Sequence, residues 1–274
     1  MGNTAYAHSY IDESRVTAKT PWLKSYDPEC PAHLDYFMGT LEEAFERMAE
    51  KYPDYIAYDF MGKSTTYKKA IADIHACAKA LKAMGIKEGD KITICMPNAP
   101  QTVTIFYAVN MVGAIANMVH PLSAVKEIAF CLRDSESVAA ITLDQFYDKF
   151  VEVRREVELP HLIITSVADA LSPIMKLGYK LTSPDKNKYK SNVLHWKQFL
   201  ANGEGQSTAA EPYDPGHACV VVHTGGTTGS PKGVMLTDSC FNAIAQQFSA
   251  YDTLFKKGQT LMNIMPPFIA YGYA

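Results

Sequence analysis

The order of hydrophobic and polar residues predicts helices from residue 40 onward. Thr40 and Glu43 have the spacing of a capping box, and apolar residues then recur at helical intervals. A second amphipathic helix is predicted from about Tyr67 to Gly85. Because such apolar stripes usually face the protein interior, we expect both helices to pack on a core.

Strands and helices alternate in the next part of the chain. The predicted elements are strands at residues 91–96, 115–119 and 138–143, and helices at residues 100–112 and 124–133. Ser123 is the predicted cap of the last helix. Alternation of this kind favours right-handed crossovers. The predicted fold class is therefore α/β, with a mainly parallel sheet flanked by helices.

The stretch from Ile92 to Val125 contains no charged side chain, which introduces the alternative of a membrane-spanning segment. Prolines, asparagines and a glycine interrupt this stretch. A strand, a helix and another strand, buried in a sheet covered on both faces, account for the missing charges and for the interruptions. We therefore favour the buried sheet.

The later pattern suggests how the chain is divided. We expect an N-terminal arm at residues 1–39, a first α/β subdomain at residues 40–200, a connector at residues 201–216 and the start of a second subdomain at residues 217–274. Within the second subdomain, a helix is predicted at about residues 238–251 and a strand at about residues 260–265.

Residues 172–191 are rich in lysine and poor in regular pattern, which predicts a solvated loop. The lysines are Lys176, Lys180, Lys186, Lys188 and Lys190. The alternative is a basic surface that makes peripheral contact with anionic lipid.

Residues 224–233 combine glycines, hydroxyl side chains and a lysine in one loop. Glycine lets backbone N–H groups close on an anion. Hydroxyl groups donate hydrogen bonds or coordinate magnesium, and Lys232 adds a positive charge. The candidate phosphate-binding residues are Thr224, Gly225, Gly226, Thr227, Thr228, Gly229, Ser230 and Lys232.

The loop lacks the spacing of a Walker A motif, because Gly233 and an apolar run follow Lys232. Apolar runs on both sides of the loop predict that it joins two strands; the alternative is a flexible surface loop. His223 and His120 lie at predicted strand ends, where we expect them to make structural hydrogen bonds.

The string Thr-Gly-Gly-Thr-Thr-Gly-Ser-Pro-Lys-Gly resembles the phosphate-binding signature of the adenylate-forming (AMP-binding) enzymes. Further landmarks in that family's order lie at residues 64–67, 85–92, 97–98, 113–114 and 121. The resemblance extends from about Thr40 to the last residue. Residues 21–26 and the Thr-Gly-Gly form of the loop are most similar to fatty acyl-CoA synthetases.

This resemblance implies that ATP converts a carboxylic acid, in particular a fatty acid, to acyl-AMP, from which coenzyme A forms acyl-CoA. It assigns Thr224 to Mg²⁺ and phosphate, and Lys232 to the pyrophosphate end as the catalytic cation. Gly225 stands where many members have Ser or Thr. The residues that it implies beside the acid are Phe268, Tyr271 and Gly272, with Ile269 in the place of a family histidine.

Residues 258–274 carry no charge and are typical of a domain interior. By the resemblance, the acidic magnesium ligand, the ribose-binding aspartate and a mobile C-terminal domain would follow this sequence. We therefore expect the N-terminal part of a larger ligase, inactive alone.

The net charge and the cysteine content limit the expected binding partners and the expected cellular compartment. With 26 Lys and Arg against 29 Asp and Glu, the formal charge is -3, so nucleic acid is not an expected partner. Six cysteines without metal-type spacing, and an N-terminus without an apolar signal, predict a cytoplasmic protein. The sequence does not indicate the oligomeric state.

Three alternative functions stay open. An aryl- or amino-acid-activating enzyme would use the same chemistry on another acid. A P-loop kinase or NTPase is disfavoured by the missing Gly-Lys-Ser/Thr sequence. A non-catalytic nucleotide-binding module would keep the loop without the reaction.

Overall fold

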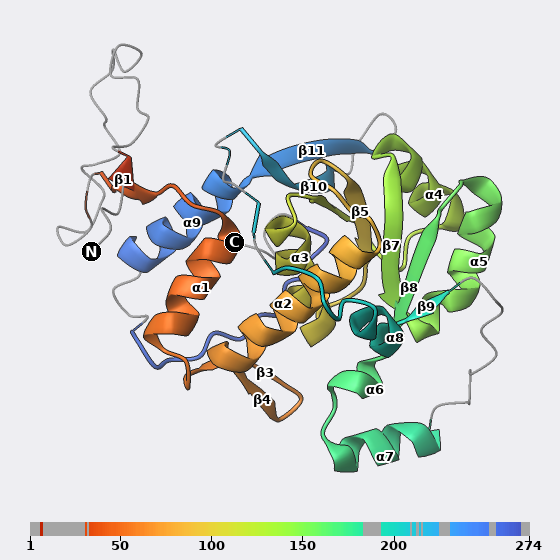
Figure 1. Cartoon of the computed structure of the whole chain (residues 1–274), viewed down its shortest axis with the longest axis horizontal. Coiled ribbons are helices and arrows are strands. Elements are labelled where there is room, and N and C mark those ends of the chain that lie inside the picture. The colour runs from red at the N-terminus through yellow and green to blue at the C-terminus, as the bar shows by residue number, and fades with distance from the viewer. Residues whose placement is uncertain are drawn as a thin grey trace.

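A seven-stranded sheet forms the centre of the protein (Figure 1). The computed structural model describes residues 6–7, 31, 33–182, 193–208, 210–211, 214, 216–224, 231–251 and 256–269. The sheet contains β5 (Lys91–Cys95), β6 (Ile115–Met118), β7 (Ser137–Leu143), β8 (His161–Thr165), β9 (Leu194–His195), β10 (Ala218–Thr224) and β11 (Lys232–Thr237). Their order is β11-β10-β6-β5-β7-β8-β9, and every neighbouring pair except β10–β11 is parallel. The predicted α/β class with a mainly parallel sheet is confirmed.

Helices cover both faces of the sheet. The helices α2 (Tyr67–Ala83), α3 (Pro100–Met111) and α8 (Trp196–Ala201) share a large buried cluster with one face. The helices α4 (Val125–Asp134) and α5 (Tyr147–Glu156) share a smaller cluster with the other face. Successive strand residues alternate between the faces, so that Ile94 joins the larger cluster and Cys95 the smaller.

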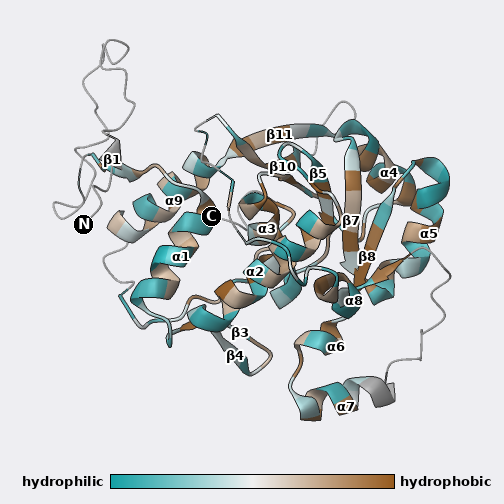
Figure 2. Ribbon diagram, in the orientation of Figure 1, coloured by the Kyte–Doolittle hydropathy of each residue, from teal (hydrophilic) through white to brown (hydrophobic). Residues whose placement is uncertain are grey.

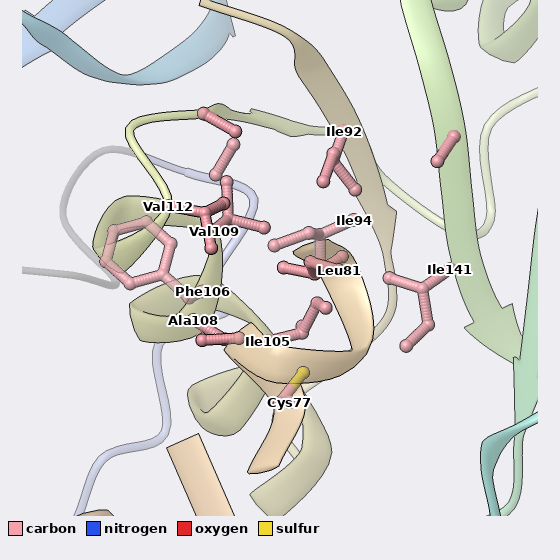
Figure 3. Close-up of a cluster of buried hydrophobic side chains, with 14 of the residues drawn as sticks. Cys77, Leu81, Ile92, Ile94, Ile105, Phe106, Ala108, Val109, Val112 and Ile141 are labelled. Atoms are coloured by element: carbon pink, nitrogen blue, oxygen red, sulfur yellow. The ribbon is translucent and has the colours of Figure 1, made fainter. Parts of the chain in front are cut away.

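The larger cluster is a close-packed aliphatic core. Figure 3 shows Leu81 of α2 and Ile105 of α3 beside Ile94 of β5, and these three side chains are fully buried. In Figure 2 the strands β7 and β8 are largely hydrophobic, whereas α4 and α5 carry many hydrophilic residues. Burial on both faces explains why residues 92–125 lack charges. No described helix is long and apolar enough to cross a membrane.

Further elements surround this core. They are β1 (Tyr6–Ala7), β2 (Tyr36–Phe37), α1 (Leu41–Lys51), β3 (Ile56–Phe60), β4 (Lys63–Thr66), the 3₁₀ helix η3 (Asp144–Phe146), α6 (Val167–Ala170), α7 (Pro173–Thr182) and α9 (Asp238–Tyr251). The buried carboxylate of Asp238 joins three helices, since it accepts hydrogen bonds from Leu41 N of α1 (2.9 Å) and Asn110 Nδ2 of α3 (2.7 Å).

The sequence predicted N-terminal caps for two helices, Thr40 for α1 and Ser123 for α4. Thr40 and Glu43 form the complete capping box of α1, as predicted. Ser123 does not cap α4: the cap position is Ala124, without a side-chain hydrogen bond, and the Ser123 carbonyl instead accepts a bond from Lys149 Nζ at 2.9 Å.

The predicted loop at residues 172–191 is wrong in its first part, because residues 173–182 form α7. Pro173 occupies the first helical position, where a missing N–H costs nothing. Lys176 pairs with Asp169 at 3.5 Å, which holds the helix to the preceding α6. Lys186, Lys188 and Lys190 lie outside the described residues.

The strand predicted at residues 260–265 does not form. No described strand runs beside this segment, and an unpaired chain cannot complete the hydrogen bonds of a sheet. The predicted start of a second subdomain at residue 217 stays a prediction. In the structure, β10 pairs with β6, so β10 and β11 are part of the central sheet.

Candidate active site

The carboxyl ends of β5, β6 and β10 meet at one edge of the sheet. The register pairs Ile94 with Met118 and Met118 with Val222, so the residues that follow these strands emerge together. After β5 the chain forms α3 on one face of the sheet and returns as β6 beside β5. After β6 it forms α4 on the opposite face and returns as β7 on the other side of β5. Such a change of direction opens a crevice between two strand ends, where open α/β sheets bind their ligands.

The candidate phosphate loop begins and ends at this edge. β10 and β11 form an antiparallel hairpin in which Thr224 is opposite Lys232, which confirms that the loop joins two strands. Both residues are exposed, and Thr224 Oγ1 donates a long hydrogen bond of 3.4 Å to the Lys232 carbonyl. No acidic residue in the described part of the chain pairs with Lys232.

Several predicted site residues lie outside the described residues. They are Gly225, Gly226, Thr227, Thr228, Gly229, Ser230, Tyr271 and Gly272. Of the predicted phosphate and metal contacts, Thr224 and Lys232 can be placed. The exposed Thr224 hydroxyl suits one ligand position of Mg²⁺, an ion that keeps several waters.

A buried polar network lies beneath the hairpin. Asn117, which is fully buried in β6, donates from Nδ2 to Thr93 Oγ1 (2.8 Å) and to Ser135 Oγ (2.9 Å). Ser137 closes the network through Thr93 (2.7 Å) and Ser135 (2.8 Å). Asn117 Oδ1 lies 2.7 Å from His223 Nε2 and, being an oxygen, must accept this bond.

His223 makes a structural hydrogen bond, as expected. Its Nε2 carries the proton donated to Asn117, which fixes the tautomer. Burial lowers the pKa of His223, against the opposing effect of the Asp134 and Glu127 carboxylates. The residue before the phosphate loop is thus anchored to the centre of the sheet.

A segment near the end of the chain lies across the same edge. Asn98, which follows β5, donates from Nδ2 to the Met265 carbonyl at 2.9 Å. His120, which follows β6, accepts the Leu122 N–H at Nδ1 (3.0 Å), the structural bond expected for it. The His120 ring packs against the Phe268 ring with centroids 4.1 Å apart. Phe268 therefore reaches the site edge and also packs against the larger cluster.

Sequence reasoning gave no role to Asn98 or Asn117. Asn98 was visible as a polar residue two positions after a predicted strand, which is a usual position for a binding residue. Asn117 stood within an apolar strand, where a buried amide requires partners. Its partners come from three other segments, so the sequence pattern could not identify them.

An apolar cavity of about 560 Å³ lies beside this edge. Its wall combines α1, β3, α3 and α9 with Asn98, Asn263 and Pro267. The cavity therefore adjoins the candidate site at Asn98, which follows β5.

Comparison with known proteins supports one family. The profile of the family described as AMP-binding enzyme matches residues 45–274. The chain is 31% identical to a long-chain-fatty-acid–CoA ligase of Bacillus subtilis over 263 residues, which are 94% of this chain and 47% of the relative. It is 30% identical to the ligase of that name from Salmonella typhimurium, covering 89% of this chain and 45% of the relative. The chain thus spans about half the length of the curated relatives it matches.

Solved structures show the same fold. A long-chain-fatty-acid-CoA ligase from Archaeoglobus fulgidus superposes with a TM-score of 0.69 at 22% identity, covering 90% of this chain and 46% of that one. A putative long-chain-fatty-acid CoA ligase from Rhodopseudomonas palustris gives 0.68 at 20% identity, with 85% and 53% covered. Since the family match extends over most of the sequence, from Phe45 to Ala274, this chain belongs to the AMP-binding enzyme family.

Proposed function

We propose that the protein activates a carboxylic acid with ATP and transfers the acyl group to coenzyme A. A carboxylate oxygen attacks the α-phosphorus of ATP, and pyrophosphate leaves. The thiol of coenzyme A then attacks the acyl carbonyl carbon, and AMP leaves. The observation that carries this proposal is that Thr224 and Lys232 are opposite each other in the hairpin and both exposed, at the open end of β10.

Lys232 is the proposed catalytic cation. Negative charge grows on the departing pyrophosphate, and a positioned ammonium group stabilises it. The Thr224 hydroxyl would hold Mg²⁺, whose charge offsets that of the phosphates. The loop residues 225–230 would add backbone and hydroxyl donors around the same group. The anchored His223 keeps the start of this loop in place.

The acid is proposed to bind beside Phe268, with Tyr271 and Gly272 in contact by the family resemblance. The adjoining apolar cavity would take the apolar part of the acid, which favours a fatty acid. The Bacillus and Salmonella relatives, both long-chain-fatty-acid–CoA ligases, support this substrate class. An aryl or amino acid is the alternative, and a panel of acids in a pyrophosphate-exchange assay would separate them.

The proposal also covers the length of the complete enzyme and its location in the cell. Because the relatives are about twice as long as the chain, we place the complete reaction in a longer polypeptide and expect no acyl-CoA from these 274 residues alone. The described cysteines Cys77, Cys95, Cys131, Cys219 and Cys240 are free thiols, in keeping with a reducing cytoplasm. The exposed helix α7 is proposed to make peripheral contact with a membrane.

Replacing Lys232 tests the proposed chemistry. In the natural polypeptide that contains this sequence, Lys232→Ala should lower acyl-AMP formation by at least about tenfold, because one charge-stabilising donor is lost. Pyrophosphate exchange measures this step. The matched control is Lys197→Ala, which removes an exposed lysine of α8, the helix that follows β9 at the opposite edge of the sheet from β11, and should leave the rate unchanged. A normal rate in the Lys232 variant would contradict the proposal.

A further inference from the structure

Three side chains with metal-binding atoms converge between α1 and α2, away from the strand ends. Glu42 and Glu46 are one helical turn apart on α1, so they share a face. His75 of α2 completes the group, with Nε2 at 3.0 Å from Glu46 Oε1. One ligand atom from each residue lies within 4.8 Å of the other two.

Glu42 is the unusual member of this group. Its exposed fraction is 1%, and neither carboxylate oxygen has a hydrogen-bond partner among the described residues. Across the same part of the chain, no lysine or arginine pairs with Glu42 or Glu46. A buried carboxylate without a partner is costly, so this position favours a bound cation.

The group also has an open side. The side chains of His75 and Glu46 are 32% and 39% exposed, whereas Glu42 closes the inner end. The two outer ligands, His75 and Glu46, are therefore accessible from solvent.

We propose that Glu42, Glu46 and His75 bind a divalent transition-metal ion of the zinc type, with water in the remaining positions. One imidazole nitrogen and two carboxylates suit zinc, cobalt or manganese better than calcium or magnesium, which prefer oxygen ligands alone. Ligand atoms about 2.1 Å from such an ion lie about 3 to 3.5 Å apart, a spacing that His75 and Glu46 already have.

A bound metal ion would connect α1 and α2, which contribute to different parts of the fold. α2 packs on the sheet, whereas α1 forms part of the cavity wall. A metal bridge between them stabilises the folded state by mass action, because the unfolded chain does not assemble the three ligands. This role is independent of the proposed ligase chemistry.

The test is a zinc titration of the purified protein after dialysis against EDTA. Calorimetry should show binding of one Zn²⁺ per chain that weakens on ligand replacement, and Zn²⁺ should raise the melting temperature. Co²⁺ in place of Zn²⁺ should give visible absorption bands from a site of low coordination number. Absence of zinc binding would overturn the proposal.

Two ligand variants and one control locate the ion. Glu42→Gln and His75→Gln should each weaken zinc affinity by at least about tenfold and abolish the rise in melting temperature. His161→Gln, which changes an exposed histidine at the start of β8, should alter neither quantity. Glu42→Gln keeps the shape of the side chain and removes its charge, so without zinc it should melt no lower than the unaltered protein. Zinc binding that both ligand variants leave unchanged would also overturn the proposal.

Discussion

At the scale of single residues, Asn117 connects the candidate site to the interior. Its side chain is surrounded by hydroxyl groups and by His223, and each of its polar atoms has a partner. A buried amide is tolerated in an apolar sheet only with such partners. The network thereby orients β6, α4 and the end of β10 relative to one another.

Removing this amide should destabilise the fold. Asn117→Ala leaves the Thr93 hydroxyl and the His223 ring with fewer partners, and we expect the free energy of unfolding to fall by about 2 kcal/mol. Urea denaturation measures this change. Asn202→Ala, at the exposed end of α8, is the control and should change stability by less than about 0.5 kcal/mol. Equal stability of the two variants would show that the network contributes nothing.

At the scale of elements, the packing of α8 against α2 depends on a glycine in the turn after α8. A Cβ at Gly203 would lie 2.6 Å from the backbone nitrogen of Ala80, closer than real contacts allow. A Cβ at Gly178 of α7 would meet no atom within 4 Å. Two glycines that look alike in the sequence therefore have different roles.

Alanine replacements should separate these roles. Gly203→Ala must push the turn away from α2 and should lower the free energy of unfolding by about 1 to 3 kcal/mol. Gly178→Ala should be neutral, or should stabilise α7 by up to about 1 kcal/mol through helix propensity. Chemical denaturation of both variants checks this difference. A neutral Gly203→Ala would mean that the turn adjusts without loss of packing.

At the scale of the whole molecule, α7 stands apart from the sheet and its covering helices (Figure 1). Ile174 and Leu177 lie on one side of it and are 86% and 63% exposed. Lys176 lies between them in sequence. A short helix with exposed apolar residues and lysines is suited to a membrane surface, although the molecule as a whole is slightly acidic.

Vesicle binding tests this contact. The protein should sediment with phosphatidylserine-containing vesicles at low salt and less at high salt. The double variant Ile174→Ser and Leu177→Ser should bind about tenfold more weakly, because two apolar side chains no longer enter the interface. Leu261→Ser with Ile264→Ser, which changes apolar residues exposed elsewhere, is the matched control. Equal vesicle binding by the two double variants would exclude α7 as the contact.

Local pattern was enough for much of the fold. The capping box at Thr40, the helical stripe from Tyr67 and the strand pair around the phosphate loop were all predictable. Each depends on residues that are close in sequence, because helix and strand periods and cap bonds are short-range. α7 was missed because its lysines resemble a solvated loop, although Pro173 and the apolar residues after it favour a helix.

The sequence by itself determined the fold class, the elements β5, α3, β6, α4 and β7 of the central layer and the hairpin around the loop, because these follow from the order of residue types along the chain; β8 and α5 were not predicted. Only the tertiary structure decided that Asn98, His120 and Thr224 share one edge, that residues 260–265 have no strand partner and that Glu42 and His75 face each other. These facts depend on strand order and helix packing. Contacts between distant segments are set by the burial of the whole chain, which no local pattern contains.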